Sequence, residues 1–155
     1  HAHDVLSDRA RRAAYETELR KGPVPSDHDD VARILAAEEK FRAGEEWLKS
    51  KDFIRARHSF EEAVRLYPDE AEFHACLGWA LWNAEGPNES AAGKANEILE
   101  RALSLNPRMD RAYVFRGHIQ KTLGHAREAE AEFEKALTCN PASAEALKEL
   151  RLRRT

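Results

Sequence analysis

Apolar residues recur along this chain at steps of three and four, and they do not alternate with polar residues as they would along a half-buried strand. One early stretch places Phe41, Gly44, Trp47 and Leu48 on a single helix face. The next places Phe53, Ala56, Phe60, Ala63, Val64 and Tyr67 on another. The pattern predicts an all-α protein built from consecutive pairs of helices.

One skeleton of small and bulky residues occurs three times: a glycine, an alanine, a bulky apolar residue, a second alanine and a proline. The copies are Gly44, Ala56, Phe60, Ala63, Pro68; Gly78, Ala95, Leu99, Ala102, Pro107; and Gly117, Ala129, Phe133, Ala136, Pro141. A recurring unit of this length predicts a stack of repeats in which each helix pair buries its apolar face against its neighbours.

The residue types of the skeleton have physical reasons. A glycine inside a helix costs roughly 1 kcal/mol relative to alanine, so a second helix is expected to approach closely at that point. The small alanines of the second helix would face the glycine, with the bulky residue beside them. The proline would end the second helix, because proline lacks an N–H and disfavours helical geometry in the residue before it.

The skeleton resembles the tetratricopeptide repeat, whose pattern is W-x2-L-G-x2-Y…A-x3-F…P over 34 residues. Leu77-Gly78 and Tyr113 match it, and Trp47 stands where the pattern has Tyr. Leu81 and Gln120 depart from it at that place in the later copies. The resemblance implies an α-solenoid of three helix pairs at 37–70, 71–109 and 110–143. A linker and helix start at 23–36 would precede the pairs as an extra N-terminal helical segment, and a capping helix at 144–155 would follow them.

The second copy is five residues longer than the other two between its glycine and its first alanine, because Gly78 and Ala95 are 17 residues apart where the other copies have 12. The extra residues include Glu85-Gly86-Pro87-Asn88-Glu89-Ser90. We expect them to project as a loop between the two helices of that pair.

The first 22 residues differ from the repeats. Val5-Leu6-Ser7-Asp8, followed by Arg12, Tyr15 and Glu16, resembles the C-terminal end of a J domain. The resemblance implies a co-chaperone of the seventy-kilodalton heat-shock chaperone, which such proteins recruit through a His-Pro-Asp motif. That motif is absent from this sequence, so recruitment would depend on the missing part of the J domain.

Composition restricts the partners. The chain has 155 residues, with Lys+Arg 25 against Asp+Glu 28 and a net charge of −3. This balance gives no reason to expect nucleic acid or a membrane surface as partner. Cys76 and Cys139 lie in apolar helical stretches, which favours buried free thiols in a reducing compartment and hence a cytoplasmic protein.

No arrangement of residues indicates catalysis or a cofactor. The seven histidines are scattered, no glycine-rich phosphate loop is present, and no nucleophile is spaced with a base. The sequence therefore predicts a protein-binding module that is not an enzyme, with no cofactor and no metal site.

The tetratricopeptide resemblance places the first helix of each pair on a concave groove. We expect the partner-binding residues to be Phe41, Arg42, Glu45, Lys49, Trp79, Trp82, Asn83, Arg111, Phe115 and His118. The family's known clamp for acidic chaperone tails is not supported, since Phe41, Glu45 and Cys76 stand at three of its places. Instead, four aromatic residues predict an exposed apolar trough.

Two hypotheses for the trough remain open. In the first, the trough binds a helical or apolar peptide segment of a partner protein. In the second, it is filled by the chain's own basic stretch Arg9–Lys21 or by another copy of the chain, as in an autoinhibited or self-assembling scaffold such as a homodimer.

Overall fold

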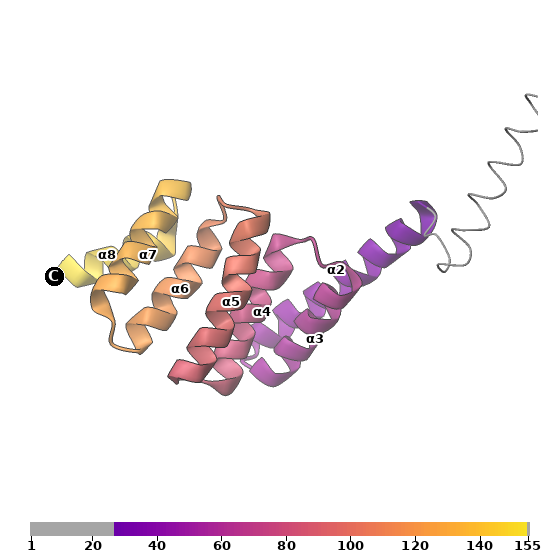
Figure 1. The fold of residues 1–155 in the computed structure, drawn as a ribbon, viewed down its shortest axis with the longest axis horizontal. Helices are drawn as coiled ribbons and strands as arrows, with labels where there is room; N and C mark the ends of the chain where they lie inside the picture. The colour runs from indigo at the N-terminus through magenta and orange to yellow at the C-terminus, as the bar shows by residue number, and fades with distance from the viewer. Residues whose placement is uncertain (1–26, 155) are drawn as a thin grey trace, which may run out of the picture. The chain divides into compact units, whose positions relative to one another are not determined.

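Seven helices make up the part of the chain that the computed structural model describes, residues 27–154, and there is no strand among these residues (Figure 1). The helices are α2 Asp27–Lys49, α3 Phe53–Leu66, α4 Ala71–Glu85, α5 Glu89–Leu105, α6 Asp110–Thr122, α7 Ala126–Cys139 and α8 Ala144–Arg154. From Ile34 onward the chain forms one compact unit in which neighbouring helices lie side by side. The sequence interpretation of residues 1–22 lies outside the described residues.

The three prolines act as the sequence predicts, each ending the second helix of a pair. One residue lies between the end of each second helix and its proline, which is Pro68 after α3, Pro107 after α5 and Pro141 after α7. The residue before each proline is extended, with ψ between 92° and 96°, and its N–H still bonds the carbonyl of the pair's second alanine at 2.8–2.9 Å. The restriction that proline places on the preceding residue therefore stops all three helices at the same register.

The repeated glycines mark the closest approach of the two helices in each pair. A Cβ on Gly44 would lie 2.5 Å from the Phe60 ring, and one on Gly117 would lie 2.6 Å from the Phe133 ring. At Gly78 the partner is the smaller Leu99, and the corresponding distance is 3.1 Å. The bulky side chain of the second helix thus occupies the space that the glycine leaves empty.

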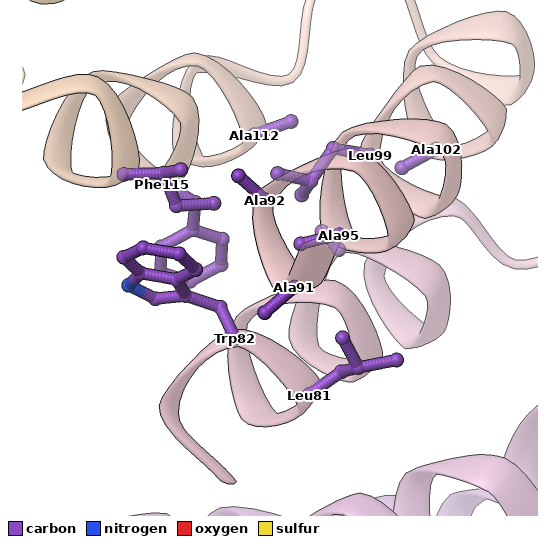
Figure 2. Packing of buried hydrophobic residues seen from close by; sticks show 11 residues of the cluster. Leu81, Trp82, Ala91, Ala92, Ala95, Leu99, Ala102, Ala112 and Phe115 are labelled. Carbon is purple, nitrogen blue, oxygen red and sulfur yellow. The ribbon is translucent and has the colours of Figure 1, made fainter. Parts of the chain in front are cut away.

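Buried side chains form three clusters along the stack, each shared between one pair and the helix that follows. The first joins α2 and α3 to α4, the second joins α4 and α5 to α6, and the third joins α6 and α7 to α8. Figure 2 shows the second cluster, where Leu81 and Trp82 of α4 and Phe115 of α6 gather around the alanines and Leu99 of α5. Because each cluster spans two units, every pair depends on its neighbour for burial.

The longer second copy does not form the projecting loop that we expected. The turns inside the three pairs all contain three residues, at 50–52, 86–88 and 123–125. Measured from its glycine, α4 runs two residues further than α2 and α6. Measured back from its first alanine, α5 begins three residues earlier than α3 and α7. The five extra residues are therefore helical, because Asn88 caps α5 through a 2.8 Å bond from the Ala91 N–H and lets the helix start early.

The end helices agree with the sequence in outline. α2 has 23 residues and is the longest helix of the described part, as predicted for a first helix that starts upstream of the first repeat. α8 covers the last pair by burying Ala146 and Leu150, which are 0% and 7% exposed, against α7. It thus shields the end of the last apolar cluster.

The three pairs differ at the register beside the glycine contact, which consists of the residue before each glycine and the residue before each bulky apolar residue. These residues are Ala43 and Ser59, Leu77 and Ile98, and Arg116 and Glu132. In the third pair the two are charged, with Arg116 Nη2 3.1 Å from Glu132 Oε1 and Glu132 only 7% exposed. Glu132 Oε2 is buried without a hydrogen-bond partner, and Lys135 Nζ lies 3.6 Å from Oε1, so Arg116 is the nearer of the two cations on this carboxylate.

We predict opposite effects of alanine at two helical glycines. Gly117→Ala forces the enclosed Phe133 ring to move and should lower the free energy of unfolding by about 1–3 kcal/mol. Gly93→Ala, in the exposed part of α5 with no atom within 4 Å of the added Cβ, should raise it by about 0.5–1 kcal/mol. Urea unfolding followed by circular dichroism measures both. Equal effects at the two sites would contradict the role of the glycine contact.

A second prediction concerns the charged pair. Arg116→Leu alone removes the nearer cation of the buried Glu132 carboxylate, leaves it with the more distant Lys135, and should cost roughly 2–4 kcal/mol. Arg116→Leu with Glu132→Ile copies the apolar residues of the second pair and should recover most of that loss. Urea unfolding of the two single variants and the double variant tests this. A double variant as unstable as the sum of the single variants would show that the ion pair is not the coupling.

Candidate functional site

A groove of about 660 Å³ runs across the first helices of the pairs and ends against α8. Side chains from α2, α4, α6 and α8 line it, together with the turn after α4. The lining residues are Leu48, Lys49, Trp79, Trp82, Asn83, Gly86, Pro87, Arg111, Phe115, His118, Thr122 and Glu145. The helices place these residues together because the first helices of successive pairs point the same way along the stack.

Two stacked aromatic rings form the floor of this groove. Trp79 of α4 and Phe115 of α6 lie parallel, with ring centroids 4.8 Å apart and an interplanar angle of 8°. His118 lies one helical turn after Phe115, with its ring centroid 5.9 Å from that of Trp79 and 5.3 Å from that of Phe133. The Arg111 guanidinium carbon lies 5.3 Å from the centroid of the Phe115 ring. A flat apolar floor with polar groups around it is typical of a ligand-binding cleft.

The expected exposed strip of four aromatic residues is wrong for three of its members. Phe41, Trp82 and Phe115 are only 7%, 4% and 6% exposed. Phe41 does not line the groove, because its ring packs among Phe60 and Phe73 at centroid distances of 5.6 Å and 5.0 Å. The stack buries more aromatic surface than we expected, since each apolar cluster spans a pair and the next helix. Trp79 alone among the four keeps a partly exposed ring.

Seven of the ten predicted residues come together on the groove: Lys49, Trp79, Trp82, Asn83, Arg111, Phe115 and His118. Phe41, Arg42 and Glu45 do not line it. The ten predicted residues did not include Leu48, Gly86, Pro87, Thr122 and Glu145, which also line the groove. Glu145 could have been found, because it lies 34 residues after Arg111 and continues the repeat into α8. Gly86 and Pro87 carried no such signal.

Every ionisable side chain that lines the groove lies beside an ionisable partner within the protein. Lys49 Nζ lies 3.0 Å from Glu46, Arg111 Nη1 lies 3.1 Å from Glu72, and His118 Nε2 lies 3.7 Å from Glu145. The hydrogen bond that Lys49 donates to the Glu46 carboxylate raises the pKa of the Lys49 ammonium. The groove therefore offers paired charges and lacks an unpaired cluster of cations.

The uncharged polar side chains of the groove are partly bonded to their own helices. Asn83 Nδ2 donates one of its two N–H groups to the Trp79 carbonyl at 2.8 Å, and the Thr122 hydroxyl donates to the His118 carbonyl at 3.0 Å. The two side-chain oxygens remain as acceptors, and the second N–H of the Asn83 amide remains as a donor. These two residues therefore offer two acceptors and one donor to a bound segment.

Cys76 takes no part in chemistry at this surface. It is 0% exposed, as predicted, and burial raises the pKa of its thiol to about 12. Because the thiolate is the reactive form, this thiol is inert at neutral pH. Cys139 is free but only partly buried, so the prediction of two buried thiols is wrong for it.

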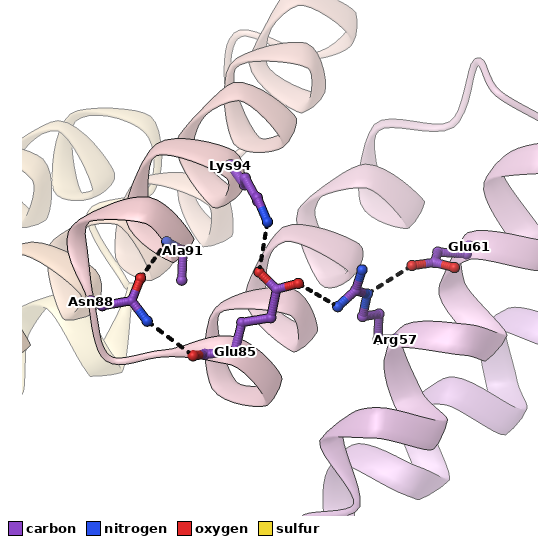
Figure 3. Close-up of polar contacts among 6 residues, drawn as sticks. All are labelled: Arg57, Glu61, Glu85, Asn88, Ala91 and Lys94. Carbon is purple, nitrogen blue, oxygen red and sulfur yellow. Dashed lines mark hydrogen bonds and ion pairs between the residues drawn. The ribbon is translucent and has the colours of Figure 1, made fainter.

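The extended end of the second pair, which borders the groove, is held by an ionic network (Figure 3). The Glu85 carboxylate bonds Arg57 of α3 at 2.8 Å and Lys94 of α5 at 3.2 Å. Asn88 Nδ2 donates to the Glu85 carbonyl at 3.1 Å. Glu85 thus ties the first pair to both helices of the second and fixes the turn at 86–88.

Comparison with known proteins agrees with this geometry. Residues 110–143 match the family model of the tetratricopeptide repeat. No curated protein sequence matches the chain. Among solved structures, the tetratricopeptide domain of Arabidopsis OM64 is similar at 24% identity and a TM-score of 0.67, over 79% of this chain and 98% of that one.

Two further similar structures contain bound chaperone peptides or segments. The first tetratricopeptide domain of Spaghetti (RPAP3) bound to the HSP90 peptide SRMEEVD has 21% identity and a TM-score of 0.64, over 76% of this chain and 89% of that one. The TPR2B domain of yeast Sti1 in its pHsp70 complex has 20% identity and a TM-score of 0.64, over 76% and 93%. The predicted all-α solenoid of tetratricopeptide helix pairs is confirmed by these likenesses. They establish the fold.

No helix in the described range 27–154 is long and apolar enough to cross a membrane. Within the same range, no group of three His, Cys, Asp or Glu side chains is placed to hold a metal ion.

We predict a pH-dependent role for Glu85. Its two cations hold the pKa of its carboxyl below the ordinary value, with the Arg57 hydrogen bond as the main cause. A lowered folded-state pKa stabilises the fold above the unfolded pKa of about 4.3, and the contribution is lost as pH falls through the folded pKa. Glu85→Gln should therefore lower stability at pH 7 and have little effect near pH 2. Urea unfolding at both pH values tests this, and an equal loss at both would exclude the ionic contribution.

Proposed function

We propose that this protein holds a peptide segment of a partner protein in the groove between α4, α6 and α8, and that it is a binding module without catalytic activity. The observation that carries the proposal is the parallel stack of Trp79 and Phe115 on the groove floor, with the Trp79 ring partly open to solvent. An aromatic surface of this kind contributes apolar contact area and loses little side-chain entropy on binding.

The shape and chemistry of the groove support a peptide over a small molecule. The groove is open and extends across four helices, from Lys49 of α2 to Glu145 of α8. Its polar groups lie around the aromatic floor, which suits an extended or helical segment that places apolar side chains inward.

Acidic chaperone tails are a weaker candidate than apolar segments. The similar domain of Spaghetti is bound to a peptide ending in Glu-Glu-Val-Asp. In this chain, Arg111 already pairs with Glu72 and Lys49 with Glu46, so an acidic tail would have to displace two carboxylates. An uncharged segment meets no such competition.

The sequence of residues 1–22 supports a finer version of the proposal. Its resemblance to the end of a J domain favours a parent protein that delivers its peptide-bearing partner to a seventy-kilodalton heat-shock chaperone in the cytoplasm. The open alternative, a groove filled by Arg9–Lys21 or by a second copy, involves residues beyond the described part or a second chain, and no contact within residues 27–154 favours it.

The experiment that tests binding starts from a random library of phage-displayed twelve-residue peptides selected on the full chain. The selected peptides, made synthetically, should bind wild type, and Trp79→Ala should weaken them by about tenfold or more, because it removes half of the aromatic stack. Isothermal titration calorimetry measures the dissociation constants.

Trp47→Ala is the matched control, since Trp47 is also a partly buried tryptophan and lies outside the groove lining. It should leave the dissociation constants unchanged. Circular dichroism checks that each variant is folded. If Trp79→Ala does not fold, Trp79→Leu replaces it, because leucine keeps apolar volume but cannot stack on Phe115. The proposal is wrong if no peptide is selected, or if the Trp47 and Trp79 variants bind the selected peptides alike.

A further inference from the structure

The extra length of the second helix pair builds a wall at one end of the groove. α4 runs two residues further than α2 and α6, so its turn is carried past the ends of those helices. Gly86 and Pro87 of this turn line the groove, whereas no residue of the turns at 50–52 and 123–125 does. The Glu85 network holds the wall in place from α3 and α5 (Figure 3).

Gly86 lets this turn close tightly on α4. A Cβ on Gly86 would lie 2.6 Å from the Trp82 carbonyl oxygen and 3.0 Å from the Trp82 ring, and the Gly86 N–H bonds that carbonyl at 2.7 Å. The backbone of the wall therefore lies against the Trp82 indole. The wall is part of the packed structure of α4.

The surface at this end is apolar and supplies acceptors. We call it the end-wall subsite, formed by Leu48, Trp82, Asn83, Gly86, Pro87 and Thr122. None of the six carries a charge, and the Thr122 hydroxyl and one of the two Asn83 amide N–H groups are bonded to helix carbonyls. Lys49 is the one cationic side chain beside it on α2, and its ammonium is paired with Glu46.

We propose that the end-wall subsite takes an uncharged apolar side chain of the bound peptide, next to an N–H donor, and rejects a carboxylate. This inference rests on the proposed function and specifies the partner: a segment with an apolar residue at this place. An apolar side chain would gain contact with Leu48, Trp82 and Pro87, while an N–H could bond the Asn83 or Thr122 oxygen. A carboxylate would lose water here and meet two acceptor oxygens, a single N–H of the Asn83 amide and a lysine already paired with Glu46.

Two threonines of the chain provide a matched test. Thr122 and Thr138 are both exposed, and each bonds the carbonyl four residues before it, at 3.0 Å and 3.1 Å. Thr122 lines the subsite, and Thr138 on α7 does not. Lysine at either place adds the same charge and volume, so effects on folding should be alike and effects on binding should differ.

The probes are synthetic peptides selected from the phage library on the wild-type full chain, with copies in which each apolar residue is changed in turn to Glu, and the peptide SRMEEVD. On wild type, Glu at one apolar place should weaken binding about tenfold or more. Thr122→Lys should weaken binding of the parent peptide by a similar factor and strengthen binding of the copy that carries Glu. Thr138→Lys should change neither dissociation constant. Fluorescence polarisation of labelled peptides gives the dissociation constants.

The outcomes separate the two proposals. If Trp79→Ala abolishes binding but Thr122→Lys and Thr138→Lys have the same effect on the dissociation constants, the proposal for the end-wall subsite is wrong and the proposal for peptide binding in the groove is retained. The subsite is also wrong if SRMEEVD binds wild type as tightly as the selected peptides. If no peptide is selected, or if Trp79→Ala has no effect, both proposals are overturned.

Discussion

The close contact between a glycine on the first helix of each pair and a bulky side chain on the second is the constraint on which the rest of the structure depends. Phe60, Leu99 and Phe133 fill the space left by Gly44, Gly78 and Gly117. The contact fixes how near the two helices lie and how they are rotated. With three pairs built in this way, the first helices point their remaining side chains toward the same groove, where Trp79 and Phe115 stack.

Because that contact sets the geometry, the other positions are free to differ in chemistry. The register beside the glycine holds Ala43 and Ser59 in the first pair, an apolar couple in the second and an ion pair in the third. The second pair is also longer, yet its five extra residues extend both helices without disturbing the contact at Gly78. Differences of this kind give a repeated scaffold a groove with distinct ends.

The periodicity of the sequence predicts the helices, their pairing and their ends, since glycine spacing and proline placement act locally. The tetratricopeptide resemblance implies that Trp79, Asn83, Arg111 and His118 share one surface, because the family pattern places the first helix of each pair on the groove. Prediction from the sequence fails where packing between neighbouring helix pairs decides whether a residue is buried or helical. Phe41 lies at a position where the repeat pattern predicts a groove residue, but it is buried against Phe73 of the next pair. The extra residues of the second copy were predicted to form a loop because no local sequence signal shows the bond between Glu85 and Arg57.

A peptide that binds on the Trp79–Phe115 floor would change the surroundings of the Trp79 indole. The most direct measurement is a titration of the ¹⁵N-labelled full chain with a selected peptide, followed through the indole N–H signals of its three tryptophans. We expect the Trp79 signal to shift with peptide concentration, while the signal of Trp47, which lies outside the groove, stays in place. A shift at Trp47 with none at Trp79 would contradict binding on this floor.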